Sequence, residues 1–174
     1  RKEKIDILPR LIKKCSEDKA FETHLQAYIV QNIGRKTNIL MDKILLGDLN
    51  FEWLGNEVSC GVGMQRIDIM ISLKKDNSRI VMPIELKSVE AKPDNIYQIQ
   101  RYVDWLEQYY LSNMVSDIQP ILISKKIENK ETDLYKSIIQ SFVDFNKKNK
   151  NWIKLKYIEY EANNSELIFE EIDY

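Results

Sequence analysis

The chain has 174 residues, of which 44% are hydrophobic and 30% charged, and its net charge at pH 7 is −1. This composition is typical of one folded domain with a single core, and it excludes a disordered chain. No apolar run reaches the ~20 residues of a membrane span and no signal peptide is recognisable, so a cytoplasmic protein is expected. The near-neutral charge argues against a strongly basic, non-specific DNA binder, but a site whose carboxylates hold metal ions remains open.

The few histidines and cysteines narrow the chemistry further. His24 is the only histidine, and Cys15 and Cys60 do not have metal-type spacing. The chain therefore offers too few histidine and cysteine ligands to favour a zinc site, and a single histidine for a Ser-His-Asp triad. Both cysteines are expected to be reduced thiols. Any catalysis is expected to depend on carboxylates and lysines. Because the sequence begins with Arg1 rather than Met, the alternative stays open that it is a fragment of a longer chain with a separate recognition domain.

The first part of the chain predicts helices. A helix over residues 17–33 is indicated by hydrophobic residues at helical spacing, with Gly34 as its stop: Phe21, Leu25, Tyr28, Ile29 and Ile33. A short helix over residues 5–15 can precede it. Residues 44–54 are poorly periodic and receive no assignment, and residues 56–60 can form a short strand.

The middle of the chain predicts two strands joined by a turn. Hydrophobic residues alternate along residues 65–73 at the spacing of a strand: Ile67, Ile69, Ile71 and Leu73. Residues 74–78 are polar and predict the turn. Residues 79–87 are rich in Ile, Val and Leu and predict the second strand.

The second half alternates helices and strands. The pattern predicts an amphipathic helix after Pro93 to about residue 110 and a central strand over 120–124. A second helix is predicted over 132–149 and carries Leu134, Ile138, Phe142 and Phe145. Two closing strands are predicted over 152–160 and 166–172, joined by a turn at Asn163–Asn164. This order of elements predicts an α/β domain with a mixed central sheet flanked by helices.

The predicted strand pair brings polar residues together. With Asp76 and Asn77 at the middle of the turn, Asp68 lies opposite Glu85, and directly opposed residues have Cβ atoms ~5 Å apart on one face. Lys87 lies two positions beyond Glu85 and shares that face. The opposite face is expected to bury in the core and carries Ile67, Ile69, Ile84 and Leu86.

Two adjacent carboxylates and an ammonium group favour metal-assisted chemistry. Neighbouring carboxylates raise each other's pKa unless a cation lies between them, and Mg²⁺ accepts a few carboxylate oxygens while keeping several waters. Such a metal lowers the pKa of a bound water, and Lys87 can orient or deprotonate that water or stabilise the transition state. The alternative is a solvated sheet face with a weak ion pair, since Glu-x-Lys alone is common.

Three segments together resemble a known family. These are Gln-Arg-Ile-Asp-Ile-Met-Ile-Ser (65–72), Pro-Ile-Glu-Leu-Lys-Ser (83–88) and Tyr-Gln-Ile-Gln-Arg-Tyr-Val-Asp-Trp-Leu (97–106). They resemble the PD-(D/E)XK nuclease superfamily, most closely the catalytic domain of NucS-type endonucleases, over residues 21–109. The resemblance implies one restriction-endonuclease-like domain over residues 1–174, with its core at about 17–124.

The resemblance also implies roles for particular residues. Asp68 and Glu85 are expected to bind Mg²⁺, for which Mn²⁺ can substitute, and Lys87 is expected to be the catalytic lysine. Glu22 matches the acidic residue that often completes such sites, although by sequence alone it is an ordinary surface residue. Gln98 and Tyr102 match a polar pair on the following helix, and their i, i+4 spacing places them on one face.

Nearby basic residues are candidates for contacts to DNA phosphates, although each taken singly is better explained as a solvated charge: Arg35, Lys36, Arg66, Lys92 and Arg101. The sequence departs from the family in two respects. No N-terminal DNA-binding domain of the NucS type is recognisable, and residues 125–174 contain no family motif.

The sequence thus predicts the catalytic domain of a magnesium-dependent DNA endonuclease acting in repair or in restriction and defence. One alternative is a catalytically silent nuclease-like module that binds nucleic acid or protein. Another is a metal-dependent hydrolase of a different phosphoester. Substrate recognition is expected from another domain or a partner chain. The partner chain can also be a second copy of this chain, in a homodimer.

Overall fold

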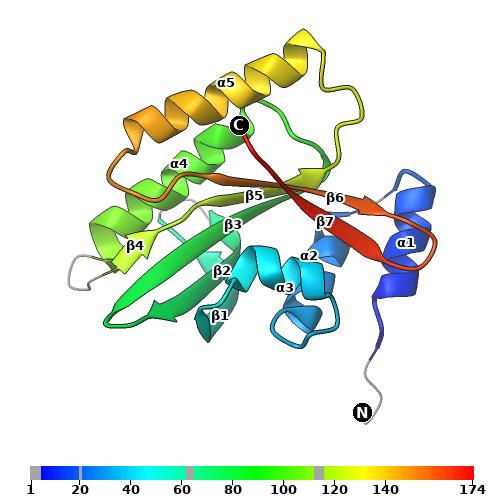
Figure 1. Ribbon diagram of the computed structural model, residues 1–174, viewed down its shortest axis with the longest axis horizontal. Coiled ribbons are helices and arrows are strands. Elements are labelled where there is room, and N and C mark those ends of the chain that lie inside the picture. Colours follow the sequence, from blue (N-terminus) through cyan, green and yellow to red (C-terminus); the bar gives the residue numbers. More distant parts are fainter. Residues whose placement is uncertain (1–4, 20, 62–64, 112–115) are drawn as a thin grey trace.

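A computed structural model of the chain describes residues 5–19, 21–61, 65–111 and 116–174, and its centre is a seven-stranded sheet (Figure 1). The strands are β1 (Asn50–Ser59), β2 (Arg66–Lys75), β3 (Ser78–Glu90), β4 (Ser116–Ile118), β5 (Ile121–Lys125), β6 (Lys156–Ala162) and β7 (Leu167–Ile172). The helices are α1 (Leu8–Ser16), α2 (Glu22–Asn32), α3 (Ile39–Leu46), α4 (Asn95–Trp105) and α5 (Asp133–Lys148), with a π-helical turn η1 (Leu106–Tyr110) directly after α4.

The sheet is mixed. Its order is β1-β2-β3-β5-β6-β7, with β4 also paired to β3. The pairs β1–β2, β2–β3 and β6–β7 are antiparallel, whereas β3 is parallel to β4 and β5, and β5 is parallel to β6. The predicted α/β class with a central mixed sheet is therefore confirmed, and β5 lies inside the sheet as expected.

Helices cover both faces of the sheet, as Figure 1 shows. On one face, α1, α2 and α3 bury a core that includes Leu25, Ile84 and Ile123. On the other face, α4 and α5 bury a second core that includes Val103 and Phe142. The alternation of side chains along β2 and β3 supplies both cores, because successive residues of a strand point to opposite faces.

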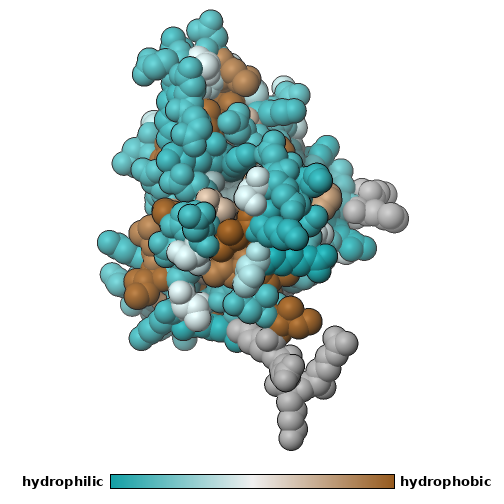
Figure 2. All heavy atoms as spheres, turned by 90° about the vertical axis from the view of Figure 1, so that its right-hand side faces the viewer, coloured by the Kyte–Doolittle hydropathy of each residue, from teal (hydrophilic) through white to brown (hydrophobic). Residues whose placement is uncertain are grey.

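The face of the molecule on the side of α1 is largely hydrophilic. Figure 2 looks at the molecule from the side on which α1 lies, and hydrophobic side chains there occupy only part of a mostly polar face. Within the described ranges, the helices are all too short or too polar to cross a membrane.

The first helices differ from the predicted ones. The helix predicted over 17–33 begins only at Glu22, because α1 extends to Ser16 and Asp18 has a φ of 54° that interrupts helical geometry. The helix α3 was not predicted, although Asn38 accepts the Met41 N–H at 3.0 Å as an N-cap. Its sequence is hydrophobic nearly all round, so it lacks an amphipathic stripe.

Smaller differences occur in the strands and in α5. The first strand begins at Asn50 rather than at residue 56, and the three-residue β4 was not predicted. The strand predicted from residue 152 begins at Lys156. In α5, Leu134 is 56% exposed, because it lies in the first turn of the helix, whereas Ile138 one turn later is buried.

The β2–β3 hairpin has the predicted turn and register. Asp76 adopts a φ of 51°, a left-handed conformation that Asp, Asn and Gly tolerate in two-residue hairpin turns. The paired residues extend from Lys75 and Ser78 at the turn to Ile69 and Ile84. This register places Asp68 and Glu85 just beyond the last regular pair.

Candidate active site

Asp68 lies where β2 and β3 stop pairing with each other. Its Oδ2 accepts a hydrogen bond from the backbone N–H of Leu86 at 2.8 Å. This side-chain bond links β2 to β3 beyond Ile69 and Ile84, where their backbone pairing ends. Ile69, Ile84 and Leu86 lie in the core under α2, as predicted. The prediction for Ile67 is wrong in one respect: it is buried, but in the opposite core under α4, beyond Ile69, where the pairing of β2 with β3 ends.

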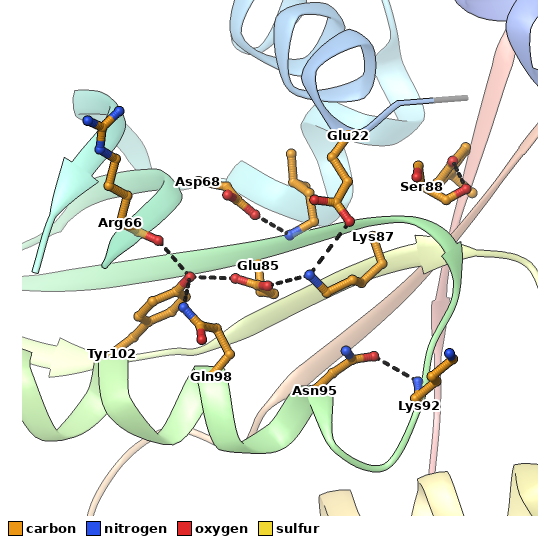
Figure 3. Close-up of polar contacts among 12 residues, drawn as sticks. Glu22, Arg66, Asp68, Glu85, Lys87, Ser88, Lys92, Asn95, Gln98 and Tyr102 are labelled. Atoms are coloured by element: carbon orange, nitrogen blue, oxygen red, sulfur yellow. Dashed lines mark hydrogen bonds and ion pairs between the residues drawn. The ribbon is translucent and has the colours of Figure 1, made fainter. Parts of the chain in front are cut away.

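Glu85 is the buried centre of a polar cluster shown in Figure 3. The residue is 4% exposed, and its two carboxylate oxygens have different partners. The Lys87 Nζ lies 2.7 Å from Oε1, and the Tyr102 hydroxyl lies 2.5 Å from Oε2. The Lys87 ammonium also lies 3.6 Å from the Glu22 Oε1 on α2. The structure therefore brings Glu22, Glu85, Lys87 and Tyr102 together.

The electrostatics of the cluster follow from this crowding. Burial, together with the negative charge of Glu85, raises the pKa of the Asp68 carboxyl to about 7, although the Leu86 N–H opposes the shift. Burial lowers the pKa of the Lys87 ammonium, but the contact with Glu85 and the nearby Glu22 outweigh it and leave that pKa above its ordinary value. Lys87 is therefore a cation at neutral pH, which suits charge stabilisation better than proton abstraction.

Tyr102 and Gln98 border the cluster from α4, as Figure 3 shows. The Tyr102 hydroxyl lies 2.7 Å from the Arg66 carbonyl as well as close to Glu85, so one proton serves two acceptors. Burial and the charge of Glu85 raise the pKa of the Tyr102 phenol, which stays neutral. The Gln98 Nε2 donates to this hydroxyl at 2.9 Å, and Arg101 donates to the Gln98 Oε1.

The predicted basic residues lie at different distances from the site. Arg66 and Arg101 flank it, and the Arg66 guanidinium lies 3.3 Å from a Glu57 carboxylate oxygen. Lys92 lies on the exposed connection from β3 to α4. Arg35 and Lys36 follow the far end of α2, ~16 Å along the helix axis from Glu22, so their closeness to the site in sequence does not become closeness in space.

Sequence reasoning missed Gln26 and the Arg66 carbonyl. The Gln26 side chain donates to the Asp68 backbone carbonyl at 2.8 Å, and the Arg66 carbonyl contacts Tyr102. The only signal for Gln26 in the sequence is its position one turn after Glu22. A backbone carbonyl leaves no signal in the sequence.

A cavity of about 250 Å³ opens beside the site, on the side of α1. It reaches Ser88, the residue after Lys87, and its wall includes Tyr160 and Lys125. Asp68, Glu85 and Lys87 are not part of its wall. The cluster is therefore a separate feature from this cavity.

The donor set of the cluster fits a hard divalent cation held by two carboxylates. In the described part of the chain, no three Asp, Glu, His or Cys side chains are grouped closely enough to hold a metal, and Glu22 is engaged with Lys87. Asp68 and Glu85 remain as an oxygen pair whose repulsion a cation would relieve. Two carboxylates with water in the remaining positions is an arrangement that Mg²⁺ accepts.

Replacing Tyr102 by Phe is expected to destabilise the protein by about 1–2 kcal/mol. The change removes the donor to the buried Glu85 and takes away the acceptor of the partly buried Gln98 amide. Urea unfolding monitored by circular dichroism measures the effect. Tyr97→Phe, at a position 66% exposed on the same helix, is the control and should unfold like the parent. Equal midpoints for both variants would contradict the assigned contacts.

Comparisons with known proteins place the chain in a family. Two solved structures, an XisH family protein from Nostoc punctiforme PCC 73102 and an fdxN element excision controlling factor protein from Anabaena variabilis, each align with 97% of this chain and 100% of their own, at 10% identity and a TM-score of 0.36. No curated protein sequence matches the chain. The family model described as the endonuclease NucS C-terminal domain matches residues 22–159, most of the chain and all of the cluster. The chain therefore belongs to the endonuclease NucS C-terminal domain family.

Proposed function

We propose that the chain is the catalytic domain of a Mg²⁺-dependent DNA endonuclease of the PD-(D/E)XK type. The observation that carries the proposal is the buried Glu85, with Lys87 at 2.7 Å and Asp68 immediately across the end of the hairpin. Family membership supports a nuclease-related domain. Burial of a carboxylate pair beside an ammonium is costly for stability, and such costs are characteristic of functional sites.

Asp68 and Glu85 are the residues that would hold Mg²⁺ or Mn²⁺, with Glu22 able to contribute if it leaves Lys87. When bound, the cation lowers the pKa of a water molecule and stabilises negative charge on a phosphoryl oxygen. The Leu86 N–H orients the Asp68 carboxylate, and the Tyr102 hydroxyl orients that of Glu85. These bonds hold both oxygens before substrate arrives, and such preorganisation is what a catalytic site requires.

In this proposal the Lys87 ammonium acts on the substrate. Its raised pKa keeps it positively charged, so it can bind a non-bridging phosphate oxygen or the attacking water and stabilise charge that develops during cleavage. Gln98, fixed by Tyr102 and Arg101, can position the same phosphate group.

DNA binding by this domain would use a few basic residues rather than a basic surface. Arg66 and Arg101 flank the cluster and Lys92 lies on the connection to α4, and these side chains suit contacts to DNA phosphates. The net charge of −1 provides little non-specific affinity, so recognition is assigned to another domain or a partner chain. An endonuclease of this kind is compatible with a role in DNA repair and with a role in restriction and defence.

Cleavage of supercoiled plasmid DNA tests the proposal. The purified chain is expected to nick or linearise the plasmid with Mg²⁺ or Mn²⁺, and EDTA should stop the reaction. Asp68→Asn, purified in parallel, controls for contaminating nucleases. Cleavage that persists in EDTA, or that is equal in the variant, would refute the proposal.

A further inference from the structure

Gln26, a buried residue of α2, contacts strands β1 and β2 next to the candidate site. It is 7% exposed, and its Nε2 lies 2.8 Å from the Asn56 Oδ1, 2.9 Å from the Glu57 Oε1 and 2.8 Å from the Asp68 carbonyl oxygen. A side-chain amide has two hydrogens for these three oxygens. The amide is therefore held in one place by β1 and β2 together.

This contact falls where the regular pairing of the sheet is interrupted. Glu57, across from Asp68 on β1, has a φ of 54°, a conformation that persists in a non-glycine residue only when its surroundings maintain it. On the other side, the β2–β3 ladder stops at Ile69. The Asp68 carbonyl thus bonds to Gln26, while the Asp68 carboxylate bonds to the Leu86 N–H.

We infer that Gln26 is a positioning residue for the Asp68 carboxylate. Without the amide, the partly buried Asp68 carbonyl would lose this donor, and its peptide would rotate toward another because carbonyls shielded from water are nearly always paired. That rotation would move the carboxylate away from Leu86 and from Glu85. The part of this inference that concerns metal affinity rests on the proposed function, since it treats Asp68 as a metal ligand.

The same helix also fixes the other strand of the site. Glu22 lies one turn before Gln26, so the two side chains leave the same face of α2. Glu22 contacts Lys87 on β3, and Gln26 contacts Asp68 on β2. The first turns of α2 therefore hold β2 and β3 at the point where these two strands separate. The Gln26 bond fixes the Asp68 peptide and thereby the direction of the Asp68 side chain.

Gln26→Met tests the inference, because methionine keeps the length of the side chain and removes its donors. The matched control is Gln100→Met on α4, which removes a comparable pair of bonds to Asn149. Amide hydrogen exchange is measured on the metal-free full chain. The Leu86 amide should exchange about tenfold faster in Gln26→Met relative to the amides of the β2–β3 ladder, and it should be unchanged in the control.

A second readout is the affinity for Mn²⁺ alone, followed by paramagnetic broadening. Gln26→Met is expected to bind Mn²⁺ about tenfold more weakly than the parent, as is typical when the support of a metal ligand is lost. If Gln26→Met fails to fold, Gln26→Asn, whose shorter amide no longer reaches Asp68, should show the same local effects.

The outcomes separate the two claims. Unchanged Leu86 exchange relative to the ladder would overturn the inference and leave Gln26 as a packing residue, whatever its effect on melting. Faster Leu86 exchange without Mn²⁺ binding by the parent would uphold the positioning of Asp68 and refute its role as a metal ligand. Faster exchange together with weakened Mn²⁺ binding supports both.

Discussion

Asp68→Asn is expected to reduce Mg²⁺-dependent cleavage by on the order of 10³-fold, because metal stabilisation of a transition state amounts to several kcal/mol. Asparagine keeps an oxygen that accepts the Leu86 N–H, so the fold should survive. This makes it a better test than Asp68→Ala, which would leave that buried N–H without an acceptor. Plasmid cleavage at saturating Mg²⁺ measures the loss.

The same variant is expected to be more stable than the parent at pH 8 in EDTA. The folded pKa of Asp68 is raised to about 7, above its unfolded value of ~3.9, so ionisation favours the unfolded state. The parent therefore loses stability as the pH rises from ~4 to ~7, and asparagine avoids this loss. The expected gain is about 2 kcal/mol, or roughly 5 °C in melting temperature at pH 8, vanishing near pH 4.

Thermal melts of parent and variant across this pH range measure the difference in stability, which cancels the contribution of groups that titrate in both proteins. A variant that melts below the parent at pH 8 would show that Asp68 is not an ionised carboxylate buried beside Glu85. A variant that cleaves DNA at the parental rate would show that Asp68 is not part of the chemistry.

Lys87→Met is expected to abolish cleavage while leaving metal binding intact. The ammonium acts on phosphate or water in the proposed mechanism, whereas Asp68 and Glu85 hold the cation. The variant should also lose about 2 kcal/mol of stability without metal, because the buried Glu85 loses the cation at 2.7 Å and keeps the neutral Tyr102 hydroxyl at 2.5 Å. Because the variant still binds the cation, added Mn²⁺ should raise its stability at least as much as it raises that of the parent.

The control for Lys87→Met is Lys126→Met, which breaks a 3.0 Å ion pair with Glu161 at the protein surface. Exposed pairs contribute ~0–1 kcal/mol, so this variant should melt near the parent and cleave normally. Equal melting of the two variants would mean that Glu85 is not dependent on Lys87 for its charge compensation.

The β2–β3 hairpin shows what the sequence determines locally. Alternating hydrophobic residues and a two-residue turn at Asp76 and Asn77 specify a register, and the structure has that register up to Ile69 and Ile84. Because the side-chain period of a strand is two, the register was enough to bring Asp68 near Glu85. The resemblance to NucS-type sequences added Glu22, whose isolated sequence context predicts only a surface residue.

The remaining features depend on tertiary contacts. Ile67 lies in the opposite core, and residues 65–73 alone do not predict this or the nearby bond from Gln26 to the Asp68 carbonyl. Arg35 and Lys36 are distant because α2 carries them away from Glu22, which closeness in sequence does not reveal. The donor from Tyr102 to Glu85 required knowing how α4 packs on the sheet.

A titration of the ¹⁵N-labelled chain with Mn²⁺ tests the central claim most directly, because paramagnetic broadening locates a cation even when it binds weakly. The amide signals of Asp68, Glu85, Leu86 and Lys87 are predicted to broaden first in the parent, and this local broadening should be absent in Asp68→Asn. Broadening centred on another part of the molecule, or equal broadening in the two proteins, would contradict a metal site at the end of the β2–β3 hairpin.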